Sequence, residues 1–287
     1  MNEANPKDLG GDNSKPRRVP PRAHDYLNGM SPHQRAMEKQ QAALMWVYEW
    51  GVSSDDIVRQ VVDQQARGYA AKLVKRNLLV QTPTESGGFI RGVPRYFYTL
   101  SAMGLAEAER HATVPMRYTE LNISKVTQRL LHHNLVAQQI TCDISHSLVG
   151  KRYFSDRRLA TRMNGKLKRP DAVLFAKDKN NRDFKLAIEV ELTAKWERDL
   201  DQFIYRMIET LNEEDESIKV DCFYIFSDSR AILERYKKAI EPGMPLQRWE
   251  KDQFGKWVSR NNIEVPEYLV KKVYFFYLDD WRKKHGR

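Results

Sequence analysis

The sequence predicts an α/β protein of two domains: a helical N-terminal domain that ends in a β-hairpin, and a C-terminal domain with a mixed sheet flanked by helices. Two patterns lead to this prediction. From residue 37 to 112, apolar residues recur at helical spacing and are followed by two short strands around a Gly- and Pro-rich turn. From residue 113 to 287, helical stretches alternate with strands, and IKVDCFYIFSD is almost wholly apolar, as in a sheet covered on both faces.

The composition is that of a globular protein with a basic excess. Of the 287 residues 41% are hydrophobic and 30% charged, and the formal net charge is +10. Such an excess suits a polyanionic partner, and nucleic acid is favoured over a membrane because no basic amphipathic helix stands out. No run approaches the ~20 apolar residues that span a bilayer, and no apolar signal segment is seen. Cys142 and Cys222 have no Cys/His cluster around them, so we expect a cytoplasmic protein without disulfides or zinc.

The first segment is predicted to be a flexible tail. Residues 1–36 are polar, rich in Pro and Gly, and without sustained periodicity. Three arginines in it are either phosphate contacts on DNA or ordinary solvated side chains: Arg17, Arg18 and Arg22.

Three helices are predicted after the tail. The first runs through AALMWVYEW and ends at Gly51, and Ser53-Ser54-Asp55-Asp56 then caps a short second helix that reaches Val62. The third is predicted from Asp63 to Arg76, with Ala66, Ala70, Leu73 and Val74 as its apolar stripe. The strands LLV and RYFYTL form a hairpin around TPTESGGFIRGVP, and a fourth helix extends from Ser101 to about Arg110.

This order of elements is that of a winged helix-turn-helix, and VKRNLLVQTPTESGGFIRGVPRYFYTLSAMGLAEAE closely resembles that family. The resemblance covers residues 38–112 and implies that the helix 63–76 enters the major groove of DNA while the hairpin lies against the backbone. The DNA-binding residues it implies are Gln64, Gln65, Arg67, Tyr69, Lys72 and Arg76 on the helix, with Arg91 and Arg95 on the hairpin. Gln65 and Arg67 are expected to contact base edges. A winged helix that binds protein is the alternative.

The C-terminal domain is predicted to start with a helix over residues 119–140, followed by the densest basic run of the chain. Residues 151–169 hold one acid, Asp156, and eight basic side chains: Lys151, Arg152, Arg157, Arg158, Arg162, Lys166, Lys168 and Arg169. The run is either a solvated loop or a DNA-binding patch, and all of these except Lys166 are taken as candidate DNA contacts.

Two strands, PDAVLFA and FKLAIEVELTA, follow the basic run. In the second strand Leu186, Ile188, Val190 and Leu192 share one face, while Ala187, Glu189 and Glu191 share the other. A helix with a clear apolar stripe (KWERDLDQFIYRMIETLNEE), the buried strand, a helix over about 229–240 and the strand KKVYFFYL complete the domain.

Pro170-Asp171 and, 18 residues later, Glu189-Val190-Glu191 give this domain a resemblance to the PD-(D/E)XK superfamily of restriction-endonuclease-like domains. The resemblance implies that Asp171, Glu189 and Glu191 bind Mg²⁺ or Mn²⁺, because hard divalent ions prefer carboxylate oxygens and activate phosphate and bound water. Glu191 departs from the family pattern, since it occupies the position of the lysine that positions or activates the attacking water. Lys195 is the expected substitute and completes the catalytic set, with Lys185 less well placed.

Structural explanations exist for the same residues. Asp171 can be a turn acid, and Glu189 and Glu191 can line a wet sheet edge paired with Lys185 and Arg182. One of His132 and His133 either faces the site of the three acids, as a ligand or proton carrier, or has an ordinary packing role in the core or at the surface. Tyr153 is the tyrosine best placed for a contact with DNA.

The combination of both motifs with the AIEVELT strand resembles the replication-relaxation family and the related MobC-type plasmid mobilisation relaxases over residues 38–280. It implies a metal-dependent DNA nicking protein of a mobile genetic element, which acts at an origin on double-stranded DNA beside other mobilisation or replication proteins. The alternatives are a non-catalytic DNA-binding plasmid or phage regulator with a degenerate nuclease-like domain, and a protein-interaction module.

Overall fold

The structure is a computed structural model that describes residues 29–63, 66–147, 152–163, 167–177 and 181–285. The chain divides into two compact units, residues 1–39 and 40–287, and the rest of this section concerns the second unit. Helix α1 (Pro32–Trp50) begins in the first unit, inside the segment predicted to be a tail. Arg17, Arg18 and Arg22 lie outside the described residues.

The N-terminal part of the second unit has the predicted order of elements. After α1 come α2 (Asp55–Val61), α3 (Tyr69–Lys75), the hairpin strands β1 (Leu79–Pro83) and β2 (Tyr96–Leu100), and α4 (Ala102–His111). The Ser54 side chain accepts a hydrogen bond from the Ile57 amide and so caps α2, and Ser101 does the same for α4 through Gly104. The predicted cap of α2, the predicted helix start at Ser101 and the predicted hairpin are therefore confirmed.

Helix α3 is shorter than predicted, because it begins at Tyr69 and not at Asp63. Asp63 and Gly68 have φ angles of 49° and 87°, in the left-handed region that interrupts a right-handed helix. The carboxylate of Asp55 accepts hydrogen bonds from the amides of Gly68 (3.3 Å) and Ala70 (3.1 Å) and thereby sets the start of α3. Gln64 and Gln65, two of the predicted DNA contacts, lie outside the described residues.

The single helix predicted over residues 119–140 is wrong. Three short 3₁₀ turns, Thr119–Leu121, Ile123–Lys125 and Gln128–Leu130, precede helix α5 (Leu131–Ser147). The side chain of Asn122 accepts hydrogen bonds from the amide (3.1 Å) and the hydroxyl (2.8 Å) of Ser124. Such local side-chain bonds compete with helix formation, and apolar spacing alone does not detect them.

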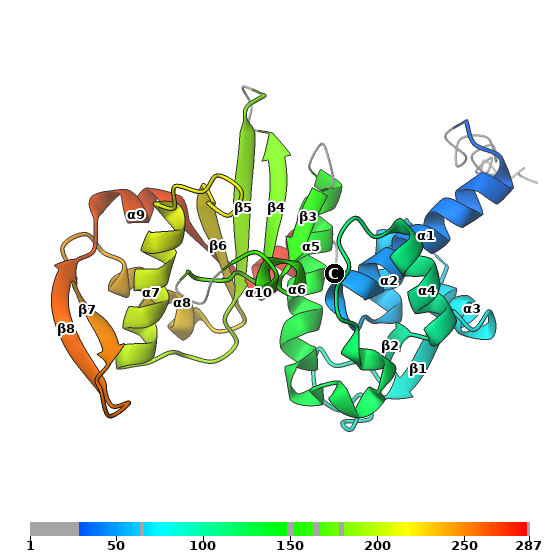
Figure 1. Cartoon of the computed structure of the whole chain (residues 1–287), viewed down its shortest axis with the longest axis horizontal. Coiled ribbons are helices and arrows are strands. Elements are labelled where there is room, and N and C mark those ends of the chain that lie inside the picture. Colours follow the sequence, from blue (N-terminus) through cyan, green and yellow to red (C-terminus); the bar gives the residue numbers. More distant parts are fainter. Residues whose placement is uncertain (1–28, 64–65, 148–151, 164–166, 178–180, 286–287) are drawn as a thin grey trace, which may run out of the picture. The chain divides into compact units, whose positions relative to one another are not determined.

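A five-stranded mixed sheet lies in the middle of the second unit (Figure 1). Its strands are β3 (Arg152–Ser155), β4 (Ala172–Lys177), β5 (Asp183–Val190), β6 (Cys222–Ser227) and β9 (Val273–Tyr277), in that spatial order. The first two contacts are antiparallel and the last two parallel. The predicted mixed α/β class is confirmed, whereas the assignment to a winged helix joined to a nuclease-like domain stays a prediction.

Helices cover both faces of this sheet. Helices α7 (Glu197–Leu211) and α8 (Arg230–Ala239) lie on one side, and α5 and α10 (Leu278–Lys284) on the other (Figure 1). The side chains of β5 alternate as predicted: Leu186, Ile188 and Val190 pack toward α5, and Ala187 packs toward α7. Glu189 is therefore on the α7 side of the central strand.

Several elements were not predicted. The basic run forms strand β3 and the short helix α6 (Asp156–Ala160), which Ser155 caps. A hairpin of β7 (Pro245–Lys251) and β8 (Trp257–Glu264) and the helix α9 (Glu267–Lys272) lie between α8 and β9. None of the described helices is long and apolar enough to cross a membrane.

Gln138 on α5 joins the N-terminal helices to the part of the chain that carries the sheet. Its side chain is fully buried and donates to the Val52 carbonyl (2.9 Å). It also accepts hydrogen bonds from the Trp46 indole (2.9 Å) and the Ser53 hydroxyl (2.8 Å). One amide thus satisfies polar groups from α1 and from the segment that leads into α2.

Candidate functional site

The three predicted acids come together where β5 ends. Strands β4 and β5 are antiparallel, with Ala172 opposite Ile188, so the start of β4 lies beside the end of β5. Asp171 precedes β4, and its Oδ2 accepts a hydrogen bond from the Val190 amide at 2.8 Å. The predicted approach of Asp171 to the glutamate strand is therefore confirmed. We call Asp171, Glu189, Glu191, Lys168 and Lys195 the acid–lysine cluster.

Glu189 is paired with Lys168. The Lys168 ammonium lies 2.7 Å from Oε1 of Glu189, and the carboxylate side chain is only 2% exposed. The backbone of Lys168 is fixed by a hydrogen bond from its amide to the hydroxyl of Thr210 on α7 (3.0 Å). Lys168 was predicted as a DNA contact, but its side chain lies against the acids with 18% of its surface exposed.

Glu191 has a different set of partners. The ammonium of Lys195 contacts both of its carboxylate oxygens, and the Tyr236 hydroxyl donates to Oε2 at 3.1 Å. The same hydroxyl accepts a hydrogen bond from the Lys195 amide (3.2 Å). Lys195 thus reaches back to the acids, as predicted, while Tyr236 on α8 has no sequence signal that marks it as a neighbour.

The ring of Phe203 on α7 lies beneath both lysines. Its centroid is 5.5 Å from the Lys168 ammonium and 4.8 Å from that of Lys195, within cation–π range. Phe203 is 3% exposed, so the aromatic surface that supports the two cations belongs to the protein core.

His133 is the histidine that reaches the cluster. Its Nε2 lies 3.0 Å from the Val190 carbonyl oxygen and 3.4 Å from Oδ2 of Asp171. The proton on Nε2 then faces the carbonyl, and the ring fixes Asp171 from the α5 side. His132 lies elsewhere, beside Gly92 of the β1–β2 turn, and burial lowers its pKa.

The alternative of a wet sheet edge is wrong. Strand β5 is the third of the five strands, and Glu189 and Glu191 are 2% and 5% exposed. Their partners are Lys168 and Lys195, whereas Lys185 pairs with Glu216.

The neighbouring carboxylates raise the affinity of Glu189 for protons. Burial, opposed by Lys168 and assisted by the charges of Asp171 and Glu191, raises the pKa of Glu189 to about 8. Burial alone would lower the pKa of Lys168, but the surrounding carboxylates outweigh it and raise that pKa. A cluster of this kind favours a positive charge in its middle, and the Lys168 ammonium supplies one.

The carboxylates of the acid–lysine cluster suit a hard divalent ion held by two of them, not by all three. Within the described part of the chain, no group of three or more His, Cys, Asp or Glu is arranged to hold a metal ion. Mg²⁺ is commonly held by one or two carboxylates together with water and substrate phosphate. Asp171 and Glu189 can form such a pair, while Glu191 is engaged by Lys195 and Tyr236.

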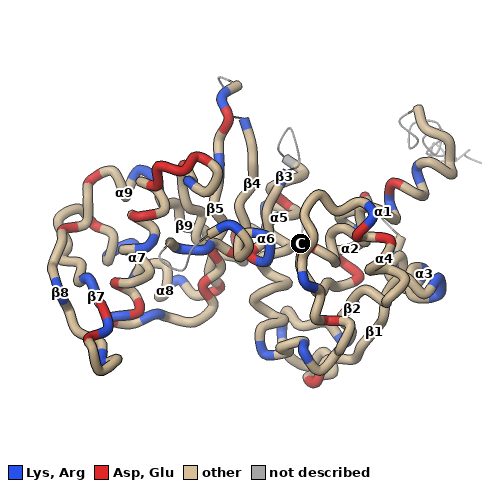
Figure 2. The backbone as a smooth tube through the Cα atoms, in the orientation of Figure 1, with Lys and Arg blue, Asp and Glu red and all other residues tan. Residues whose placement is uncertain are grey.

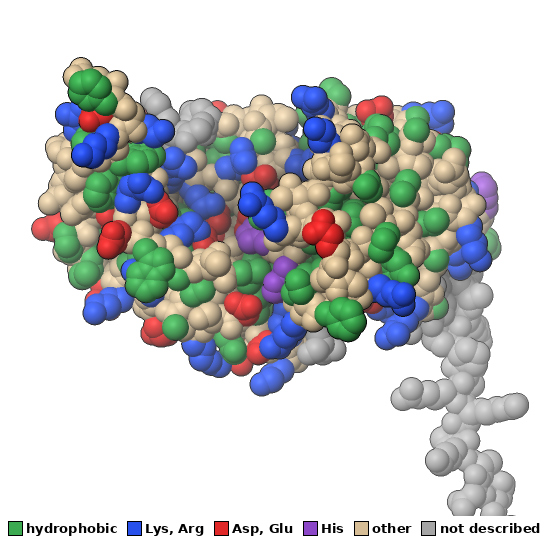
Figure 3. All heavy atoms as spheres, turned by 90° about the horizontal axis from the view of Figure 1, so that it is seen from below, with side chains coloured by type: hydrophobic (Ala, Val, Ile, Leu, Met, Phe, Trp, Pro, Cys, Tyr) green, Lys and Arg blue, Asp and Glu red, His purple; other side chains and the backbone are tan. Residues whose placement is uncertain are grey.

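The predicted groove helix and hairpin place most of their basic residues at the surface. Lys72 on α3 is exposed, as are Arg67 just before the helix and Arg76 just after it, while Tyr69 is half-buried. Lys and Arg positions are spread over the chain and mixed with acids (Figure 2). Seen from below, Lys and Arg side chains border a hollow that also contains acidic and His side chains (Figure 3).

The basic run is less available than predicted. Arg158 pairs with the buried Glu49, and Arg157 pairs with Glu120 at 3.0 Å. Arg152, Arg162 and Arg169 are exposed, the first two near the Phe154 ring and the third paired with Asp156. Lys151 and Lys166 lie outside the described residues. Tyr153 is not a surface residue for DNA: it packs against Trp46 and Trp50, with ring centroids 4.9 and 6.3 Å away.

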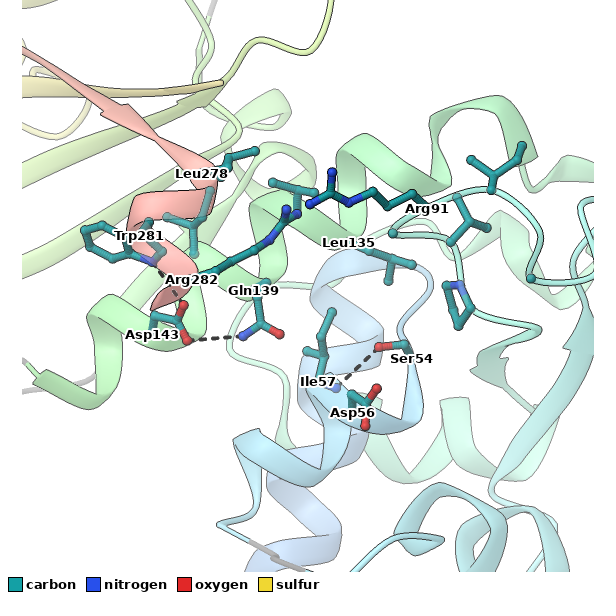
Figure 4. Close-up of a pocket in the computed structure, with 17 residues that line it drawn as sticks. Ser54, Asp56, Ile57, Arg91, Leu135, Gln139, Asp143, Leu278, Trp281 and Arg282 are labelled. Carbon is teal, nitrogen blue, oxygen red and sulfur yellow. Dashed lines mark hydrogen bonds between the residues drawn. The ribbon is translucent and has the colours of Figure 1, made fainter. Parts of the chain in front are cut away.

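Arg91 and Arg95 lie on the β1–β2 hairpin, and Arg91 lines a separate pocket. Arg91 and Arg282 both contact Oδ1 of Asp279 at 3.2 Å, and Arg95 lies 5.3 Å from the Tyr96 ring centroid. A pocket of about 420 Å³ lies between the hairpin turn, α2, α5 and α10. Figure 4 shows Arg91 and Arg282 extending toward one another over this pocket. Its buried Asp143 accepts hydrogen bonds from the side chains of Gln60, Gln139 and Trp281, so this carboxylate already has partners.

No family model matches the chain, and no curated protein or solved structure matches it.

Proposed function

We propose that the protein binds duplex DNA through its N-terminal helices and β1–β2 hairpin, and cuts one strand at the acid–lysine cluster. The proposal describes a nicking protein of the kind that acts at an origin of a mobile element. The observation that supports it most is the convergence of Asp171 and Glu189 with Lys168 at the end of a central strand.

Each member of the cluster has a role in this proposal. Asp171 and Glu189 hold Mg²⁺ or Mn²⁺, which when bound supplies a Lewis acid for the scissile phosphate and a more acidic water. The Val190 amide donates to Asp171, and the His133 ring lies against the same carboxylate. Glu189 must be ionised to bind a cation, and its pKa of about 8 means that binding releases a proton.

The lysines neutralise charge that accumulates at the phosphate. Lys168 stays protonated among the carboxylates, because its pKa is raised. Glu191 stands where the family pattern has a lysine, and it holds the ammonium of Lys195, four residues later. Glu191 therefore orients the lysine that substitutes for the missing one. Preorganised cations of this kind stabilise developing negative charge without reorganisation during the reaction.

The DNA-binding part of the proposal rests on the order α1, α2, α3, β1, β2, α4 and on exposed cations. Arg67 precedes α3, Lys72 lies on it and Arg76 follows it, a placement that suits a helix facing the major groove. The net charge of +10 favours a polyanion as the partner.

A second function, DNA binding without cleavage, is favoured by a specific observation. Lysines contact both Glu189 and Glu191, so the acids are neutralised without any ion. In that case the cluster is a structural element of a DNA-binding regulator.

A plasmid assay tests both functions. Supercoiled plasmid that carries the DNA flanking the gene for this chain is incubated with the protein and Mg²⁺ or Mn²⁺. The nicking proposal expects open circles from the wild type, none from Glu189→Gln, and an unchanged yield from Glu234→Gln, the same substitution at an exposed position on α8. If the wild type shifts this DNA in a gel without nicking it, the regulator is supported. If it neither shifts nor nicks the DNA, both functions are overturned.

A further inference from the structure

Trp196 is a large apolar side chain left in solvent beside the acid–lysine cluster. It directly follows Lys195, and 62% of its surface is exposed. Tryptophan usually has most of its surface buried, so an exposed one next to a chemically unusual site needs an explanation.

One face of the Trp196 ring is covered by an arginine. The guanidinium carbon of Arg235 lies 3.5 Å from the ring centroid, which is stacking distance. Arg235 is half-buried, and its Nε donates to the carbonyl of Lys195 at 3.1 Å. The arginine therefore fixes the indole from one side, and the exposed surface is free for another flat group.

Helix α8 connects this stack to the cluster. Arg235 holds Trp196, and the next residue, Tyr236, donates its hydroxyl to Glu191. Both residues also bond the backbone of Lys195, Arg235 at its carbonyl and Tyr236 at its amide. The position of the indole relative to the acids is thus set by adjacent residues on one helix.

The backbone turns sharply at this point. Trp196 is extended, with φ −126° and ψ 148°, and Glu197 has a φ of 40°. A non-glycine residue in the left-handed region is uncommon and costs conformational energy. The turn directs the chain into α7 and leaves the indole outside the core that α7 forms.

We propose that Trp196 is a stacking platform for an unpaired nucleobase of a DNA strand bound at the acid–lysine cluster. The inference rests on the proposed function and specifies its substrate: the strand is locally single-stranded where it meets the cluster. In a duplex both faces of each base are already stacked, so a single accessible indole face suits a base that has left the stack. Arg235 adds a positive charge at the platform, which suits the phosphates that flank such a base.

The test measures binding of fluorescein-labelled oligothymidylate by anisotropy, without divalent ions so that no cleavage interferes. Trp196→Ala is expected to weaken binding by about tenfold or more, as for loss of one aromatic stacking partner. Trp196→Phe keeps a ring face and is expected to retain most of the affinity. Arg235→Lys keeps the charge but not the planar group that fixes the indole, and is expected to lie between the two.

Phe254→Ala is the matched control, since this residue on the β7–β8 turn is 84% exposed and belongs to no part of the cluster; its affinity is expected to equal that of the wild type. The thermal unfolding of each variant checks that the fold is intact. Equal affinities of Trp196→Ala and the wild type overturn the platform. Equal losses in Trp196→Ala and Phe254→Ala overturn it as well, because they indicate non-specific aromatic contacts. Nicking of plasmid by the wild type then decides separately whether the proposed function stands.

Discussion

The Lys168 ammonium lies 2.7 Å from Oε1 of Glu189, and the two side chains are only 18% and 2% exposed. A buried ion pair contributes little net stability when compared with apolar residues of the same shape, but removal of one partner leaves an uncompensated charge. This relationship decides how the cluster responds to mutation, pH and metal ions.

Lys168→Met is expected to destabilise the protein most at high pH. Without the ammonium, Glu189 faces two neighbouring acids and its pKa rises further, because Lys168 lowers that pKa in the wild type. Above the raised pKa the cost is about 3–5 kcal/mol. Below that pKa Glu189 is protonated and the cost falls. Urea unfolding of the variant and the wild type, at one pH below and one pH above the pKa of Glu189, measures the loss of stability at each pH. A loss of the same size at both pH values contradicts the prediction.

Glu189→Gln is expected to change the pH dependence of stability in a defined window. The pKa of Glu189 is about 8 in the folded protein against 4.5 for a free carboxyl. The folded state therefore binds an extra proton between these values, and stability falls as pH rises through the window. The amide does not titrate, so this fall is expected to disappear from the unfolding free energy of the variant. Glu234→Gln is the control and keeps the wild-type profile.

A divalent ion is expected to raise the melting temperature. Binding to the folded state alone stabilises it by mass action, and Asp171 and Glu189 are the proposed ligands. Calorimetry with Mn²⁺ should show the rise in the wild type and its loss in Asp171→Asn. A rise that persists in this variant removes Asp171 from the ion site.

Arg158→Met is expected to destabilise the protein by about 3–5 kcal/mol, because it leaves a carboxylate buried without its cation. Arg158 pairs with Glu49, which is 5% exposed, and burial raises the pKa of that carboxyl. The double variant Glu49→Gln/Arg158→Met should recover part of the loss, since neither charge remains. Additive losses in this double-mutant cycle contradict a direct interaction.

Lys72→Ala is expected to lower the salt dependence of DNA binding. A lysine that contacts one phosphate contributes about one unit to the slope of log affinity against log salt. Lys72 is exposed on α3, and Lys271→Ala on α9 provides an exposed lysine of the other half of the chain as a control. Equal slopes for all three proteins mean that α3 does not face the backbone.

The strand of the two glutamates could be predicted because its information is local. Period-two alternation fixes which side chains of β5 share a face. A Pro-Asp pair at the start of the antiparallel neighbour must then lie beside the end of β5. The cap of α2 is equally predictable, since a serine before an apolar-periodic run needs no distant partner.

The partners of the acids could not be predicted in this way. Lys168 stands in a run of basic residues, where its most natural interpretation is surface charge. What turns it inward is the hydroxyl of Thr210, 42 residues later, together with the Phe203 ring. Tyr236 is also placed by the packing of α8 on the sheet. Such contacts depend on tertiary structure, and no spacing in the sequence encodes them.

The hydrogen bonds of Gln138 have a consequence for the geometry of the proposed cleavage. This amide bonds Trp46, Val52 and Ser53 at once, so the start of α2 is fastened to α5. Helix α5 also carries His133, which touches Asp171. In a protein that recognises one DNA sequence and cuts another, such a connection fixes the distance between the two sites. The number of base pairs between the recognised sequence and the nick is then set by the folded protein and not by a flexible linker.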